Sequence, residues 1–114
     1  MCRSLRVLVA SSSPDRLSAL RQAAAGAEWE LSGGAVALEG LVVALESGEP
    51  DVVVIDAELG LEAVRTVRRA RPGARLVAFG PLPGADAEAG SYEEIGAAIL
   101  GLPRPGGPVG GVEG

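Results

Sequence analysis

The chain has 114 residues, enough for one domain with a single core, and it contains neither histidine nor lysine. These absences exclude imidazole bases, Ser–His–Asp and Cys–His nucleophiles, Schiff-base chemistry and the lysine of phosphate-binding loops. The net charge of −5 argues against a nucleic-acid surface, and no stretch approaches the ~20 apolar residues of a membrane span. We therefore expect a cytoplasmic protein without nucleic-acid or membrane partners.

Strands and helices alternate in the first half of the chain. Residues 5–10 form a short apolar run that predicts a buried strand. Ser13, Pro14 and Asp15 supply an N-cap, a first-turn proline and a first-turn acid, so they predict the start of a helix that stops near Gly26. A half-exposed strand is expected at 28–31, ending at Gly33 and Gly34. A second helix is expected from 38 to 48.

The second half continues this alternation. The uninterrupted apolar run at 52–55 ends at Asp56 and is typical of a central parallel strand that is covered on both faces. Leu61, Val64 and Val67 form the apolar face of a third helix, and residues 75–79 form a fourth strand. Alternating strands and helices with short connections predict a parallel sheet with right-handed crossovers.

The pattern weakens after residue 80. Residues 81–84 predict a turn, and residues 85–89 can form at most one helical turn. Ser91 and Glu94 have the spacing of a capping box, which predicts a last helix ending near residue 100. We expect one domain at 1–102 and a disordered tail at 103–114, which is rich in proline and glycine.

Several stretches of this pattern resemble the receiver domains of bacterial response regulators. Residues 6–16 follow that family's opening strand, loop, proline and first helix, and residues 49–56 (Glu-Pro-Asp-Val-Val-Val-Ile-Asp) resemble its third strand. Residues 65–72 and 91–95 are similar to its third helix and to the start of its final helix. The resemblance covers residues 5 to 101 and implies an α/β, flavodoxin-like (CheY-like) fold.

The resemblance implies a phosphate-accepting site at Asp56 that lacks its usual neighbours. Receivers hold Mg²⁺ with acids after the first strand, whereas this chain has Ser11, Ser12 and Ser13. Gly80 stands where the family has a serine or threonine, and the family's lysine is missing. Because phosphoryl transfer depends on positioning and charge neutralisation, we expect a vestigial phosphoacceptor with no catalysis, metal or cofactor. Asp56 is then expected to cap the third helix or to bond to the serine loop.

A receiver also needs a fourth helix and a fifth strand, for which residues 81–90 are too few. This predicts a sheet of order 2-1-3-4, in which residues 75–79 form an edge strand. An exposed strand edge invites pairing with another chain. We therefore predict an interface at Leu76, Val77 and Phe79 for a second copy or for a partner protein.

Together these features imply a stand-alone, degenerate receiver (a pseudo-receiver). It would act as a phosphorylation-independent protein-interaction module in bacterial two-component signalling, within a homodimer or a hetero-complex, and would not be an enzyme. Two alternatives remain open at this point. One is a phospho-accepting receiver that uses Asp56, and the other is a protein that binds an anion, a nucleotide or a flavin at Ser11–Ser13.

Overall fold

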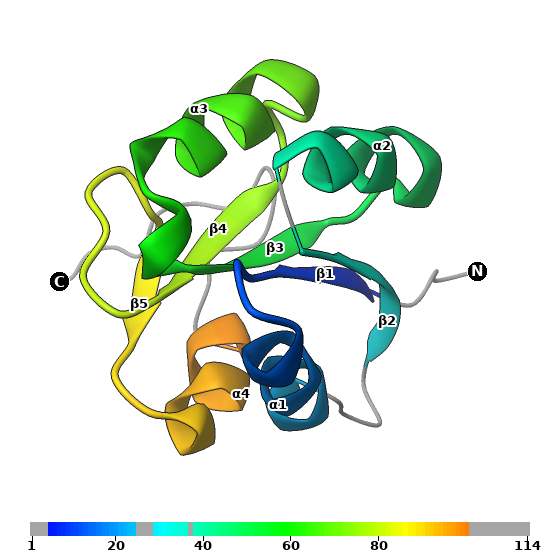
Figure 1. Ribbon diagram of the computed structural model, residues 1–114. Coiled ribbons are helices and arrows are strands. Elements are labelled where there is room, and N and C mark those ends of the chain that lie inside the picture. The colour runs from blue at the N-terminus through cyan, green and yellow to red at the C-terminus, as the bar shows by residue number, and fades with distance from the viewer. Residues whose placement is uncertain (1–4, 25–28, 37, 101–114) are drawn as a thin grey trace, which may run out of the picture.

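The computed structural model describes residues 5–24, 29–36 and 38–100. These residues form a parallel sheet of order β2-β1-β3-β4-β5 between two layers of helices (Figure 1). The flavodoxin-like architecture predicted from the sequence is therefore confirmed. The elements are β1 (Leu5–Ala10), α1 (Pro14–Ala24), β2 (Trp29–Ala35), α2 (Leu38–Gly48), β3 (Val52–Asp56), η1 (Ala57–Leu59), α3 (Leu61–Ala70), β4 (Arg75–Phe79), β5 (Ala87–Ala89) and α4 (Tyr92–Leu100).

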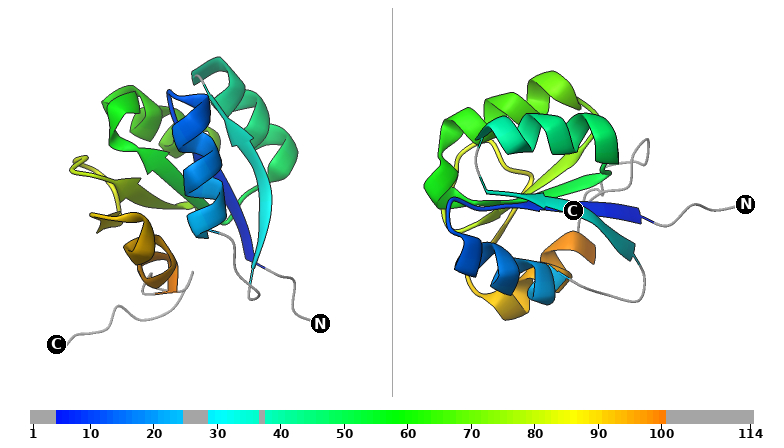
Figure 2. Two further views of the ribbon diagram at one scale, coloured as in Figure 1. Left: turned by 60° about the horizontal axis from the view of Figure 1, so that its bottom comes forward. Right: turned by 45° about the vertical axis from the view of Figure 1, so that its right-hand side comes forward.

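The sheet separates two apolar cores. Helices α1 and α4 cover one face, and α2 and α3 cover the other (Figures 1 and 2). Successive side chains of a strand point to opposite faces. In β3, Val53 and Ile55 accordingly pack with α2 and α3, while Val52 and Val54 pack with α1 and α4. All of β3 is buried, as the continuous apolar run predicted.

The corner after β4 differs from the prediction of a four-stranded sheet. Residues 80–86 contain no helix, so the fourth helix of a receiver is indeed missing there. However, a fifth strand is present, since Ala87–Ala89 pairs with Val77–Phe79 of β4. The expectation that β4 is an edge strand is therefore wrong. Leu76 and Val77 are 1% and 0% exposed, which removes the basis for an interface at these residues and Phe79.

The corner is closed by the side chain of Asp86. Its Oδ2 accepts a hydrogen bond of 2.7 Å from the backbone N–H of Leu76, and its own N–H donates to the Leu76 carbonyl at 2.9 Å. Arg68 of α3 holds this carboxylate through Nη2 at 3.3 Å and also donates to the Gly84 carbonyl at 2.9 Å. Leu82 lies buried in the core beneath α2 and α3. One aspartate and one leucine thus anchor the connection between β4 and β5.

Several smaller predictions need correction. Strand β2 continues through Gly33 and Gly34 to Ala35, because its pairing with β1 resumes at Gly33 after a register shift between Val7 and Leu8. Leu61, predicted to lie on the apolar face of the third helix, is the first residue of α3 and is 46% exposed. Glu94 accepts from the N–H of Gly90 at 2.7 Å, one residue before the predicted capping-box partner.

Two further predictions concern residues that the structure does not describe. The helix stop at Gly26 and the tail at 103–114 both lie outside the described residues. Within the described ranges, no helix has the length and apolar character to cross a membrane.

Candidate functional site

The candidate site lies at the carboxyl ends of β1 and β3, where the order of the parallel strands reverses direction. Open α/β sheets bind ligands at such a switch point. Ser11 follows β1 and Asp56 ends β3, and the structure brings the two together: the Ser11 hydroxyl donates to Asp56 Oδ2 at 3.0 Å. Both residues are almost fully buried, at 0% and 1% exposure. The acid and the serine loop are thus neighbours.

Asp56 uses both of its carboxylate oxygens. Oδ1 accepts the backbone N–H of Glu58 at 3.1 Å, so that Asp56 caps the short helix η1. The expectation that it caps α3 is wrong, because η1 intervenes and the N-cap position of α3 is Gly60. The alternative expectation, a hydrogen bond to the serine loop, matches the contact with Ser11.

Arg16, which the sequence reasoning did not single out, completes the shell around Asp56. Its Nη1 lies 3.2 Å from Asp56 Oδ2 and 3.4 Å from Oδ1, and it also pairs with Glu58 Oε2 at 3.2 Å. The negative charges of Asp56 and then Glu58 raise the pKa of Arg16 above its ordinary value, so the guanidinium stays charged. The cation closest to the acid is therefore a side chain of the same domain.

The three serines have unequal roles. The Ser11 hydroxyl accepts the N–H of Ser13 at 3.2 Å while it donates to Asp56. Ser13 Oγ accepts the N–H of Arg16 at 3.4 Å, which confirms the predicted N-cap of α1. Ser12 is exposed, and its hydroxyl donates to Glu58 Oε1 at 3.3 Å. Each of these hydroxyls has a hydrogen-bond partner within the domain. An anion placed here would lie next to the carboxylates of Asp56 and Glu58 as well as the guanidinium of Arg16.

Gly80 borders the site for a reason of backbone geometry. It has φ +103°, which side chains of L-residues rarely adopt, and a Cβ built on it would lie 3.2 Å from Ala57 Cβ. Its N–H donates to the Ala89 carbonyl at 3.0 Å and so links β4 to β5. A serine or threonine here would be strained. The glycine fits the turn out of β4, where it offers no hydroxyl to a phosphoryl group.

The arrangement of aromatic and acidic side chains determines whether a flavin or a metal ion could bind near the site. Phe79 and Tyr92 stack on each other, with ring centroids 4.8 Å apart and an interplanar angle of 20°. Their facing surfaces are thereby used, which leaves these two rings poorly placed to hold a flavin between them. Among the described residues, no three Asp, Glu, Cys or His side chains gather closely enough to hold a metal ion.

Comparison with solved structures defines the fold. The isolated receiver domain of RcsB from Salmonella enterica serovar Typhimurium, in the presence of phosphomimetic BeF3⁻, aligns with TM-score 0.71 and 15% identity over 86% of this chain and 87% of that chain. The signal receiver domain of NarL from Mycobacterium tuberculosis aligns with TM-score 0.69 and 19% identity over 87% and 95%. A CheY-like receiver domain protein from Methanospirillum hungatei aligns with TM-score 0.70 and 16% identity over 86% and 92%.

This chain has the fold of a response-regulator receiver domain. No protein-family model and no curated protein matches its sequence. Within the receiver fold, Asp56 occupies the end of the third strand, and the loop after the first strand reaches it with Ser11. The cation that pairs with the Asp56 carboxylate is Arg16.

Proposed function

We propose that this receiver domain is a protein-interaction module in two-component signalling that works without phosphorylation, in the cytoplasm. The observation that carries the proposal is the Arg16 guanidinium, seated 3.2 Å from Asp56 Oδ2 on a carboxylate that is 1% exposed. The site that accepts phosphate in an active receiver is occupied here by an internal ion pair. The surface of the module is then fixed and does not switch.

The bonding around Asp56 explains why phosphorylation is disfavoured. An attacking carboxylate needs a free oxygen in line with the phosphoryl donor. Here Oδ2 accepts from Ser11 and Arg16, and Oδ1 accepts from Glu58 and Arg16. Mg²⁺ prefers carboxylate ligands, and the loop offers serine hydroxyls. An arginine–carboxylate pair is charge-assisted, so freeing the acid means losing the contacts with Arg16 together with the hydrogen bonds from Ser11 and Glu58.

The phospho-accepting alternative has one observation in its favour. Arg16 places a permanent positive charge next to Asp56, and charge neutralisation is a large part of phosphoryl-transfer catalysis. Such a receiver would have to swing Arg16 from Asp56 to the incoming phosphoryl group. The Arg16 side chain is 37% exposed, so solvent reaches it, and the experiment has to separate the two functions.

Beryllofluoride with Mg²⁺ separates them, since it mimics an aspartyl phosphate. We expect the amide NMR spectrum of the wild-type protein to remain unchanged around Asp56, and the spectrum of an Asp56→Asn variant to respond identically. The variant keeps the size of the side chain and removes the charge that the mimic requires. Shifts in Ser11, Glu58 and their neighbours that occur in the wild type and vanish in Asp56→Asn would instead establish a phospho-accepting receiver.

A further inference from the structure

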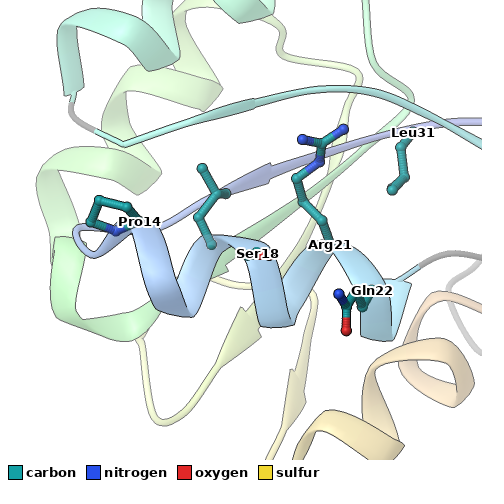
Figure 3. Close-up of a pocket in the computed structure, with 6 residues that line it drawn as sticks. Pro14, Ser18, Arg21, Gln22 and Leu31 are labelled. Carbon is teal, nitrogen blue, oxygen red and sulfur yellow. The ribbon is translucent and has the colours of Figure 1, made fainter.

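An open groove of about 440 Å³ runs between α1 and β2, on the side of the molecule away from α4. Figure 3 shows the helix along one wall and the strand along the other. Apolar side chains form much of its surface, and it contains one charged side chain. The lining residues are Pro14, Leu17, Ser18, Arg21, Gln22 and Leu31.

The groove exists because of how the helices are distributed. Helix α1 packs against α4 on one flank, and in the described part of the chain no helix covers its other flank. Strand β2 beside it is the outermost strand of the sheet and is seven residues long. Its outer backbone groups have no strand partner among the described residues. Edges of this length are templates for an added strand, whereas the opposite edge, β5, has only three residues.

Arg21 brings a positive charge to this edge. Its side chain leaves α1 and points toward β2 in Figure 3. Gly34 of β2 lies beside this side chain, since a Cβ built on Gly34 would lie at contact distance, 3.4 Å, from both Arg21 Cδ and Leu17 Cδ1. Among the described residues, no ion pair or side-chain hydrogen bond engages the Arg21 guanidinium, and the residue is exposed. A free cation thus stands at an open strand edge in a protein of net charge −5.

We propose that this groove receives an extended acidic segment of a partner protein, which pairs with the outer edge of β2 and places a carboxylate on Arg21. Strand addition supplies affinity through backbone hydrogen bonds, and side-chain pockets supply specificity. The guanidinium of Arg21 favours a carboxylate, which it can bind with two parallel hydrogen bonds. The proposal rests on the interaction function above, to which it adds the surface and the chemistry of the partner.

A second copy of the chain fits this edge less well. Antiparallel pairing of β2 with its own copy, about a two-fold axis perpendicular to the sheet, places both α1 helices on the same face. Both Arg21 side chains then lie in one combined groove, where like charges repel each other. A partner strand that carries an acid neutralises the single cation instead.

Short random peptides displayed on phage provide the probe. The wild-type protein is panned, enriched peptides are synthesised, and their affinities are measured by fluorescence anisotropy against three variants. Arg21→Glu reverses the charge in the groove, and Gly34→Val fills it at a position where the backbone tolerates a side chain. Arg69→Glu is the matched control, because it makes the same charge change on the exposed surface of α3.

We expect enriched peptides with acidic residues that lose affinity by at least about tenfold in Arg21→Glu, the equivalent of one charge-assisted hydrogen bond. Gly34→Val should weaken them as well, and Arg69→Glu should not. Bound peptide should slow hydrogen exchange at the β2 amides that do not pair with β1. The proposal is overturned if no peptide is enriched, if Arg21→Glu binds equally well, or if a dimer of the chain protects these amides. None of these outcomes depends on Asp56, so the beryllofluoride result is judged separately.

Discussion

Two arginine–aspartate pairs hold two regions of this molecule, and they differ in the surroundings of the carboxylate. In the candidate site at the end of β3, Asp56 is 1% exposed and is enclosed by Ser11, Arg16 and the Glu58 backbone. At the corner after β4, the Asp86 side chain is 24% exposed. Both arginine side chains are 37% exposed. The two arginines are therefore equally exposed, and the pairs differ in how deeply the aspartate is buried.

This difference assigns the two pairs different roles. A buried carboxylate must keep its hydrogen bonds, because each one lost leaves a costly unsatisfied group. The site around Asp56 is thus stabilised by polar contacts that also occupy the oxygens of its carboxylate. At the corner, water can replace much of what Arg68 supplies to Asp86, and exposed ion pairs contribute little. Most of the stability of the corner should therefore come from the apolar anchor, Leu82.

Truncation of that anchor should have the largest effect. Leu82 is 5% exposed in the core beneath α2 and α3, and Leu82→Ala leaves a cavity there. We expect the free energy of unfolding to fall by about 3 kcal/mol. Leu61→Ala is the control, because Leu61 is 46% exposed and its loss should cost less than about 0.5 kcal/mol. Urea denaturation measures both, and equal effects would show that the corner does not depend on Leu82.

At the candidate site, we expect an intermediate effect from Ser11→Ala. The change removes a donor from Asp56 and an acceptor from the Ser13 N–H; the first contact is buried and the second is partly buried. Unfolding free energy should fall by about 2 kcal/mol, the cost of buried polar groups left without partners. Ser12→Ala, on the exposed serine, should change it by less than about 0.5 kcal/mol. If the two serines proved equivalent in thermal or urea unfolding, the site around Asp56 would be more hydrated than its burial indicates.

The smallest effect is expected for the polar pair at the corner. Asp86→Ala should lower the free energy of unfolding by only about 1 kcal/mol, since solvent reaches the pair. Locally, exchange of the Leu76 amide should accelerate by roughly tenfold, because that N–H loses its 2.7 Å acceptor. Asp86→Asn retains an acceptor oxygen and should keep this exchange slow. A Leu76 amide that exchanges slowly in both variants would mean that the strand pairing alone protects it.

Much of the fold could be predicted because its elements carry strong local patterns. The apolar run of β3, the cap of α1 and the spacing of Val64 and Val67 in α3 all agree with the structure. Strand β5 could not be predicted, because Ala-Glu-Ala has low intrinsic strand preference and is only three residues long. It forms through pairing with β4 and through the contacts of Asp86 with Leu76. These interactions join residues that are not neighbours in the sequence.

Asp56 and the serine loop of the candidate site could be predicted from the sequence, whereas the cation, Arg16, could not. The ends of β1 and β3 meet in any sheet of this topology, which brings Ser11 and Asp56 together. Arg16 was missed because a charged residue in the first turns of a helix normally faces solvent. A signal was present nonetheless: with no lysine in the chain, a buried Asp56 needs another cation, and Arg16 directly follows the capped helix start. Residue type did not reveal which way its side chain turns.

The position of Trp29 makes the groove visible to spectroscopy. It is the single tryptophan of the chain, it begins β2, and its indole N–H donates to the Ala24 carbonyl at the end of α1. The ring therefore bridges the two elements that border the groove. The single tyrosine, Tyr92, is 41% exposed and stacks on Phe79 of β4, away from this edge of the sheet. Without any attached dye, indole emission can therefore follow the edge strand and the end of α1.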